Sequence, residues 1–210
     1  MWILYAFGSA CFAGLTAVLA KCGIEHTNSH LATALRTIVV LIFSWIMVGI
    51  VGSFDTIHTI THKTFLFLIL SGISTGASWL CYFKALQQGN INKVTAVDKT
   101  SVVLTIILSL IFFKESVTVY KIIGTIVLTT GTYLMVEKKE DNKQTNNAWL
   151  LYAVLSVIFA SLTTILGKIG ITNIESNLGT AIRTSVVLIM SWIVVFATHS
   201  QMNMKSMPKK

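Results

Sequence analysis

The stretch WILYAFGSACFAGLTAVLAKCGI, residues 2–24, returns with substitutions as WLLYAVLSVIFASLTTILGKIGI at residues 149–171. A second stretch, LATALRTIVVLIFSWIMV at residues 31–48, matches LGTAIRTSVVLIMSWIVV at residues 178–195 with the same offset. About 27 of the 47 positions from residue 2 to residue 48 are identical. Polar and aromatic landmarks stay in register: Lys21 with Lys168, Arg36 with Arg183, and Trp45 with Trp192. Apolar composition alone would not align such landmarks, so the chain contains an internal duplication.

The balance of hydrophobic to charged residues predicts an all-α integral membrane protein. Hydrophobic residues make up 54% of the chain and charged residues 11%, and the mean hydropathy is +0.75. A soluble domain carries roughly 25% charged residues. The apolar residues arrive in blocks of about 20, which is long enough for a helix to cross a bilayer. Seven transmembrane spans are predicted: Trp2–Ala20, Leu31–Gly52, Phe65–Leu86, Val94–Phe113, Val119–Val136, Ala148–Gly167 and Leu178–Ala197.

The remaining composition argues against several other classes of protein. The net charge of +8 comes from cations between the spans, where they set orientation and contact lipid head groups, so we expect no nucleic-acid partner. No nucleophile-elbow, phosphate-loop or zinc-protease pattern occurs, and we expect neither an enzyme nor a cofactor. We also expect no metal or disulfide, because the residues that could form them are scattered or lie in polar connections: Cys11, Cys22, Cys81, and the pairs His26/His30 and His58/His62.

The duplicated unit contains five spans, and an odd number has a topological consequence. A chain that crosses five times leaves on the opposite face, so the second copy is inverted relative to the first. We expect a first repeat at residues 1–140, a polar linker at 141–147, and a second repeat at 148–210 that is truncated after two helices. Either the chain is a fragment of a ten-span protein, or the missing helices come from a homodimer or a second chain.

The residues from Tyr82 to Thr118, YFKALQQGNINKVTAVDKTSVVLTIILSLIFFKESVT, resemble the EamA-like family of the drug/metabolite transporter superfamily. The similar features are the ALxxG pattern, a helix with a polar start, and an apolar run that ends before Glu115. The following stretch, IIGTIVLTTGTYLMV from Ile122, looks like that family's fifth helix. The resemblance implies a multi-pass carrier of small metabolites or drugs in the cytoplasmic membrane.

Charged residues inside the spans are the first candidates for a substrate site, because each costs about 2.5–3.5 kcal/mol at the centre of a membrane helix on insertion scales. Asp98 and Lys99 lie near the start of the fourth span, and either they face a cavity or they form an interfacial turn. Arg36 and Arg183 occupy equivalent places in the two repeats. Either they contact substrate or they share a structural role.

The third span supplies the other candidates. Trp79 and Tyr82, with Lys84 beside them, could line a pocket for an aromatic or cationic ligand. The competing interpretation is an aromatic belt at the membrane interface. In the same span Gly72 and Gly76 form GxxxG, which predicts close helix packing.

These features predict a permease that moves a small metabolite or drug by alternating access between two inverted repeats. Its partners would then be that small molecule and the lipid bilayer. Two alternatives stay open on the residues alone. The chain could be a truncated, non-transporting membrane subunit or remnant, or it could be a lipid-linked sugar flippase.

Overall fold

The computed structural model describes residues 2–24, 28–114, 118–135, 148–171 and 174–198, and within them all regular secondary structure is helical. The elements are α1 (Trp2–Ile24), α2 (Ser29–Val51), the 3-10 helix η1 (Ser53–Thr59), α3 (His62–Gln88), α4 (Ile91–Phe113), α5 (Val119–Met135), α6 (Ala148–Gly170) and α7 (Ser176–Ala197). Six of these helices are long and apolar enough to cross a bilayer, and α5 is a shorter apolar helix of 17 residues. The predicted all-α membrane fold with about seven spans is therefore confirmed.

Local chemistry sets where several helices begin and end. The Asn28 side chain accepts a hydrogen bond from the backbone N–H of His30, which starts α2, and Gly52 ends that helix in the left-handed region (φ 74°). His30 and His62 therefore begin helices α2 and α3, and the expectation that they lie in connections is wrong. Polar residues at a helix start satisfy exposed backbone N–H groups, so the helices extend beyond their apolar cores. His26 lies outside the described residues.

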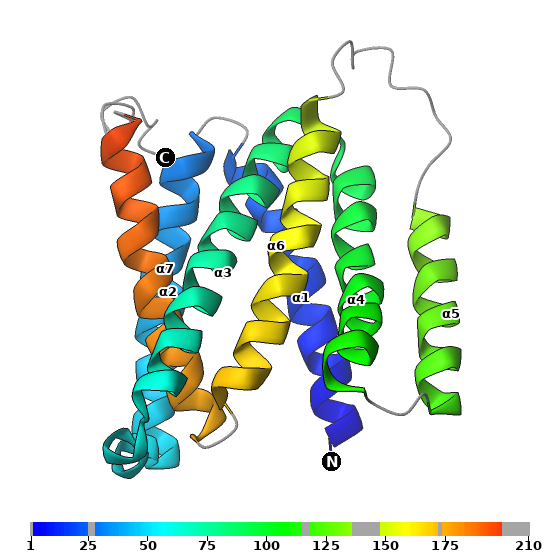
Figure 1. Ribbon diagram of the computed structural model, residues 1–210. Helices are drawn as coiled ribbons and strands as arrows, with labels where there is room; N and C mark the ends of the chain where they lie inside the picture. Colours follow the sequence, from blue (N-terminus) through cyan, green and yellow to red (C-terminus); the bar gives the residue numbers. More distant parts are fainter. Residues whose placement is uncertain (1, 25–27, 115–117, 136–147, 172–173, 199–210) are drawn as a thin grey trace.

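The two repeats run in opposite directions through the bundle. Figure 1 shows α1 rising from the N-terminus while α6, its repeat mate, descends, and it shows the same inversion for α2 and α7. The helix starts also correspond, because Asn28 caps α2 and the equivalent Glu175 caps α7. The polar linker predicted at residues 141–147 falls outside the described residues, as does the end of the chain from residue 199.

Hydroxyl groups and small side chains hold the centre of the bundle together, where α3 and α6 cross (Figure 1). The Ser71 hydroxyl donates to the carbonyl oxygen of Thr163 at 2.9 Å, and the Ser78 hydroxyl donates to that of Ser156 at 3.1 Å. On the other side of α6, the Ser161 hydroxyl donates to a backbone carbonyl of α4 at 3.0 Å. Such contacts are the usual means of helix association in lipid, where water supplies no hydrophobic driving force.

The glycines of the GxxxG pair lie against α7. A Cβ atom at Gly72 would lie 2.8 Å from Val186 Cβ and 2.9 Å from the carbonyl oxygen of Arg183. A Cβ atom at Gly76 would lie 2.8 Å from the sulfur of Met190. Only glycine allows the backbone of α3 to approach α7 this closely.

Helix α1 has a very different environment from its repeat mate. None of its residues from Ile3 to Cys22 is buried, whereas a third of the corresponding window of α6 is. Its contacts with α2, α3 and α4 are confined to a few residues. At its carboxyl end, the Lys21 amine donates hydrogen bonds to the carbonyl oxygens of Leu86 and Gly89 at the end of α3. Helix α5 packs on α4 at the edge of the bundle (Figure 1).

Replacing Gly72 by alanine should destabilise the fold, because the new Cβ meets backbone as well as side-chain atoms. Overpacking of this kind costs about 1–3 kcal/mol. The matched control is Gly124→Ala in α5, where no described atom outside its own stretch of helix lies within 4 Å of the added Cβ. Thermal unfolding of the purified protein should show a lower Tm for Gly72→Ala and an unchanged or higher Tm for Gly124→Ala. Equal shifts would contradict the close α3–α7 contact.

The Glu175 cap predicts a pH-dependent contribution to stability. A 2.7 Å hydrogen bond from the Ser53 hydroxyl is the largest cause that holds the pKa of Glu175 below its ordinary value of 4.5, and the backbone N–H groups of Asn177 and Leu178 add to it. Because the folded pKa is the lower one, the stabilisation is complete above about pH 4.5 and is lost as the pH falls through the folded pKa.

This dependence can be measured by thermal unfolding of the parent and of Glu175→Gln between pH 7 and pH 3. The Tm difference between them should shrink as the pH falls. Glu175→Asn copies the cap that Asn28 provides in the first repeat, and it should retain capping while removing the titration. A Tm difference that stays constant over the whole range would contradict the role of the carboxylate.

Candidate functional site

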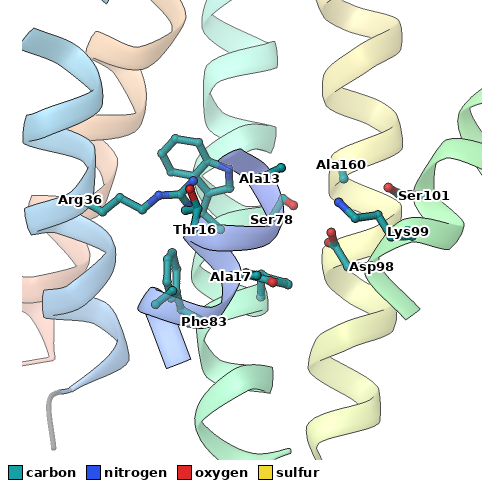
Figure 2. A pocket seen from close by; sticks show the side chains of 13 residues that line it. Ala13, Thr16, Ala17, Arg36, Ser78, Phe83, Asp98, Lys99, Ser101 and Ala160 are labelled. Carbon is teal, nitrogen blue, oxygen red and sulfur yellow. The ribbon is translucent and has the colours of Figure 1, made fainter. Parts of the chain in front are cut away.

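A cavity of about 260 Å³ lies among α1, α2, α3, α4 and α6. It has a polar lining from α2, α3 and α4 and a small-residue wall from α1, and its lining residues are Ala13, Thr16, Ala17, Ala20, Arg36, Ser78, Trp79, Tyr82, Phe83, Asp98, Lys99, Ser101 and Ala160. Figure 2 shows Arg36 reaching in from one side and Asp98 and Lys99 lying at the other. The small side chains of α1 leave the space open, because larger residues at those positions would fill it.

The cavity lies toward one face of the bundle. Arg36 and Asp98 each lie seven residues after the first residue of their helices, α2 and α4, which is about 10 Å along the axis. Both helices begin at the same end of the bundle, where the carboxyl end of α3 also lies (Figure 1). A site about two turns from the starts of α2 and α4 is close enough to one end of the bundle to exchange ligand with water.

Arg36 is held on aromatic rings of α3. Its guanidinium carbon lies 4.6 Å from the centroid of the Trp79 ring and 5.5 Å from that of Phe83. Such cation–π contacts stabilise by about 0.5–2 kcal/mol, more when water is excluded. They position a planar cation with several N–H donors beside the cavity, which suits recognition of a carboxylate or phosphate.

Asp98 belongs to a short chain of polar groups that connects the cavity to the α3–α6 contact. The Ser156 hydroxyl lies 3.4 Å from an oxygen of Asp98 and 3.2 Å from the hydroxyl of Ser78. Ser78 itself lines the cavity, so the network joins α3, α4 and α6 at one point. A carboxylate next to Lys99 and these hydroxyls has the partners that a charged group needs at membrane depth.

Among the lining residues the formal charges are those of Arg36, Lys99 and Asp98, which sum to +1. In Figure 2 Arg36 lies on one side of the space, and Asp98 and Lys99 lie together on the other. A cavity of this kind can accommodate an anion, or a dipolar molecule whose two ends find opposite charges. Electrostatic attraction is strong there, because the surrounding helices and lipid have a low dielectric constant.

The cavity brings together five of the seven residues singled out from the sequence: Arg36, Trp79, Tyr82, Asp98 and Lys99. The other two do not line it. The Lys84 amine donates to the side-chain oxygen of Gln87 at 3.4 Å on the last turn of α3. Arg183 packs where α3, α6 and α7 meet, and its Nη1 would lie 3.4 Å from a Cβ at Gly167. The two equivalent arginines therefore have different surroundings.

Sequence reasoning did not single out the serines of the network. Ser78 and Ser156 are buried and contact each other, although hydroxyl residues in an apolar helix commonly bond only to their own backbone. One signal was present, because Ser156 is matched by Ser9 in the first repeat. Thr16, on the α1 wall of the cavity, is likewise matched by Thr163, which accepts the hydrogen bond of Ser71.

Comparison with known proteins agrees with this architecture. The model of the EamA-like transporter family matches residues 1–137. An uncharacterized transporter of a Sinorhizobium species is 40% identical over 134 residues, which are 64% of this chain and 95% of that protein. An uncharacterized transporter of Bacillus subtilis is 27% identical over 132 residues, 60% of this chain and 42% of that protein. No solved structure matches the chain. The family match covers well over half of the chain, and the protein belongs to the EamA-like transporter family.

Proposed function

We propose that the cavity is the substrate site of a carrier that moves a small metabolite across the cytoplasmic membrane by alternating access. The observation that carries this proposal is the convergence of Arg36, Asp98 and Lys99 on one space between apolar helices long enough to cross a membrane. Charged residues in membrane helices usually line substrate or ion pathways, because placing a charge in the bilayer costs free energy. Family membership supports transport as the activity, and the substrate follows from the chemistry of the cavity.

The volume of the cavity favours a small metabolite over a drug. Pockets for drug-sized ligands measure roughly 300–1,000 Å³, and this cavity measures about 260 Å³. The polar lining points the same way, because drug sites are lined mainly by apolar side chains. A compact polar molecule fits both properties.

The charges favour an anionic or dipolar ligand over a simple cation. The sequence also suggested a cationic ligand stacked on Trp79, but the guanidinium of Arg36 already lies 4.6 Å from the centre of that ring. A second cation on the same ring would meet like charge. A carboxylate or similar anion directed at Arg36 would instead gain charge-assisted hydrogen bonds, and a positive group on the same ligand could approach Asp98.

The inverted repeat supplies a means of alternating access. Helices α1 and α6, and likewise α2 and α7, have similar sequences and opposite directions (Figure 1). Two such halves can exchange conformations, which opens a central site first to one side and then to the other. The position of the cavity about 10 Å from one end of α2 and α4 fits a site open toward that side.

The first test is ligand-dependent thermal stabilisation of the purified protein with small carboxylates, zwitterions and amines of matched size. We expect stabilisation by carboxylates or zwitterions and none by simple amines. Arg36→Gln should weaken the apparent affinity about tenfold to a hundredfold, because a hydrogen bond to a charged group contributes about 1.5–3 kcal/mol. Lys84→Gln is the matched control, since Lys84 does not line the cavity, and it should bind like the parent.

Flux of the stabilising ligands into proteoliposomes then separates transport from binding alone. Uptake that Arg36→Gln abolishes and Lys84→Gln preserves would support the carrier. Absence of both stabilisation and flux for every class in the panel would contradict it, and it would favour the non-transporting subunit. Exchange of a lipid-linked sugar by the same vesicles would favour the flippase.

A second variant tests the role of the carboxylate. Asp98→Asn keeps the shape of the side chain and its contact with Ser156 but raises the formal charge of the cavity from +1 to +2. Affinity for simple carboxylates should rise several-fold, while affinity for zwitterions should fall, because the attraction for a positive group is lost. Competition binding with one ligand of each class measures both changes. Equal changes for the two classes would show that Asp98 does not contact the positive end of the ligand.

A further inference from the structure

The two equivalent arginines lie toward opposite ends of the bundle. Arg36 and Arg183 each lie seven residues after the first residue of their helices, α2 and α7, which is about 10 Å along the axis. These two helices pack against each other and run in opposite directions (Figure 1). The substrate cavity lies toward the Arg36 end, so Arg183 lies on the other side of the centre of the bundle.

The guanidinium of Arg183 lies beside a small space that Gly167 leaves on α6. A Cβ atom at Gly167 would lie 3.4 Å from Arg183 Nη1 and 3.4 Å from the hydroxyl oxygen of Ser71. A cation of α7 and a hydroxyl of α3 therefore border the same space. The repeat mate of Gly167 is Ala20, which lines the substrate cavity together with Arg36. Each repeat thus places its arginine and a small residue of the preceding helix beside one space.

The charge of Arg183 is suited to an anionic ligand. In the part of the chain that the structure describes, no carboxylate forms an ion pair with this side chain. Charged residues between apolar helices usually pair with an opposite charge or line a path for charged ligands. A planar guanidinium binds a carboxylate or phosphate well, and the low dielectric constant of the surroundings strengthens the attraction.

A row of hydroxyl groups along the α3–α6 contact connects the two arginine positions. Three hydroxyl residues of α3 face α6 in turn: Ser71, Thr75 and Ser78. The Thr75 hydroxyl lies 3.3 Å from that of Thr163, and the Ser78 hydroxyl lies 3.2 Å from that of Ser156. Ser71 borders the space beside Arg183, and Ser78 lines the substrate cavity. The row therefore offers polar partners from one position to the other.

An apolar contact lies between Arg183 and the nearer end of the bundle. A Cβ atom at Gly170, the last residue of α6, would lie 3.2 Å from Leu68 Cδ2 of α3. Leu68 is completely buried, and it lies about one turn closer to that end than Ser71 does. Separation of Leu68 from Gly170 would open a path to Arg183 from that end.

We propose that Arg183 is the second anion-binding position of the carrier. It holds the carboxylate or similar anionic group of the substrate when the path is open at the end away from the cavity, and Arg36 holds the same group when the path is open at the cavity end. Leu68 covers the Arg183 position in the present conformation. This inference rests on the proposed function, because it assigns a second resting place to the substrate of that carrier.

The competing explanation is that Arg183 only fills space between α3, α6 and α7. A packing role requires the length of the side chain, whereas anion binding requires its positive charge. Arg183→Met keeps a long side chain without the charge, and Arg183→Lys keeps the charge. The two replacements therefore separate the explanations.

The first experiment compares two thiol reagents of similar size and opposite charge, sulfonatoethyl and trimethylammonioethyl methanethiosulfonate. The full chain carries Ser71→Cys, and its three native cysteines are replaced by serine. We expect the anionic reagent to react faster, and Arg183→Met should lower the ratio of the two rates about tenfold, because a nearby cation attracts one reagent and repels the other. The ratio is measured because a cation also raises the thiolate fraction, which speeds both reactions.

The control thiol is Thr16→Cys, on the α1 wall of the substrate cavity. Its rate ratio should fall with Arg36→Gln and stay unchanged with Arg183→Met, because the two arginines lie toward opposite ends of the bundle. Arg183→Lys should preserve the ratio at Ser71→Cys. Thermal unfolding of each variant checks that it is folded.

Uptake into proteoliposomes, without any introduced cysteine, tests the place of Arg183 in transport. Arg183→Met should still be stabilised by small carboxylates, because Arg36 binds them in the cavity, but its uptake should fall about tenfold or more, as expected for loss of a hydrogen bond to a charged group. Arg183→Lys should retain more uptake than Arg183→Met. A packing role predicts the reverse order.

The outcomes separate this inference from the proposed function. A rate ratio that depends on Arg183, with selective loss of uptake in Arg183→Met, supports the second position. Equal ratios with and without Arg183, or no reaction of folded Ser71→Cys with either reagent, overturn it, as does uptake by Arg183→Met at the rate of the parent. The uptake result decides if Ser71→Cys does not fold. Absence of both stabilisation and uptake in the parent contradicts the carrier itself, whereas failure of the second position leaves parental uptake intact.

Discussion

The crossing of α3 and α6 is the contact on which the rest of the structure depends. In a bilayer the lipid tails solvate apolar side chains as well as another helix does, so association needs close backbone approach and polar bonds. Ser71 and Ser78 provide those bonds, because each hydroxyl of α3 donates to a backbone carbonyl of α6. Ser161 makes a similar bond from α6 to α4. The crossing joins a helix of the first repeat to one of the second, and the other helices are arranged around it.

The candidate substrate site is a continuation of this crossing. Ser156 bonds to α3 on one side and lies 3.4 Å from Asp98 of α4 on the other, so the same residue that fixes the helices also places the carboxylate. On the side of the crossing where α1 lies, the small side chains of α1 leave a cavity. Arg36 enters this cavity from α2. The structure thus combines a closely packed wall at α3, α4 and α6 with a lightly packed wall at α1. That combination suits a carrier, because a wall with few contacts can move at low cost in free energy.

The two repeats have similar sequences, but their equivalent lysines and arginines have different surroundings. Lys21 bonds to carbonyl oxygens at the carboxyl end of α3, whereas its mate Lys168 lies 4.5 Å from the centre of the Phe113 ring on α4. Arg36 lies on Trp79 beside the cavity, and its mate Arg183 lies in the packed contact of α6 with α3. The asymmetry arises because α3 packs closely on α6 and α7 and α4 packs closely on α6, whereas both make fewer contacts with α1 and α2.

The sequence by itself determined the class of fold, the approximate positions of the apolar helices, and the inversion of the two repeats. These follow from simple properties of the sequence: apolar length sets a span, and an odd number of spans reverses the next copy. It also marked Arg36, Trp79, Tyr82, Asp98 and Lys99, since polar and aromatic residues stand out in apolar helices. Only the tertiary structure decided that these five line one cavity while Lys84 and Arg183 lie apart from it, and that Ser156 connects the site to the core. The physical reason is that membrane helices are apolar on every side, so their sequence carries little information about which face meets which neighbour.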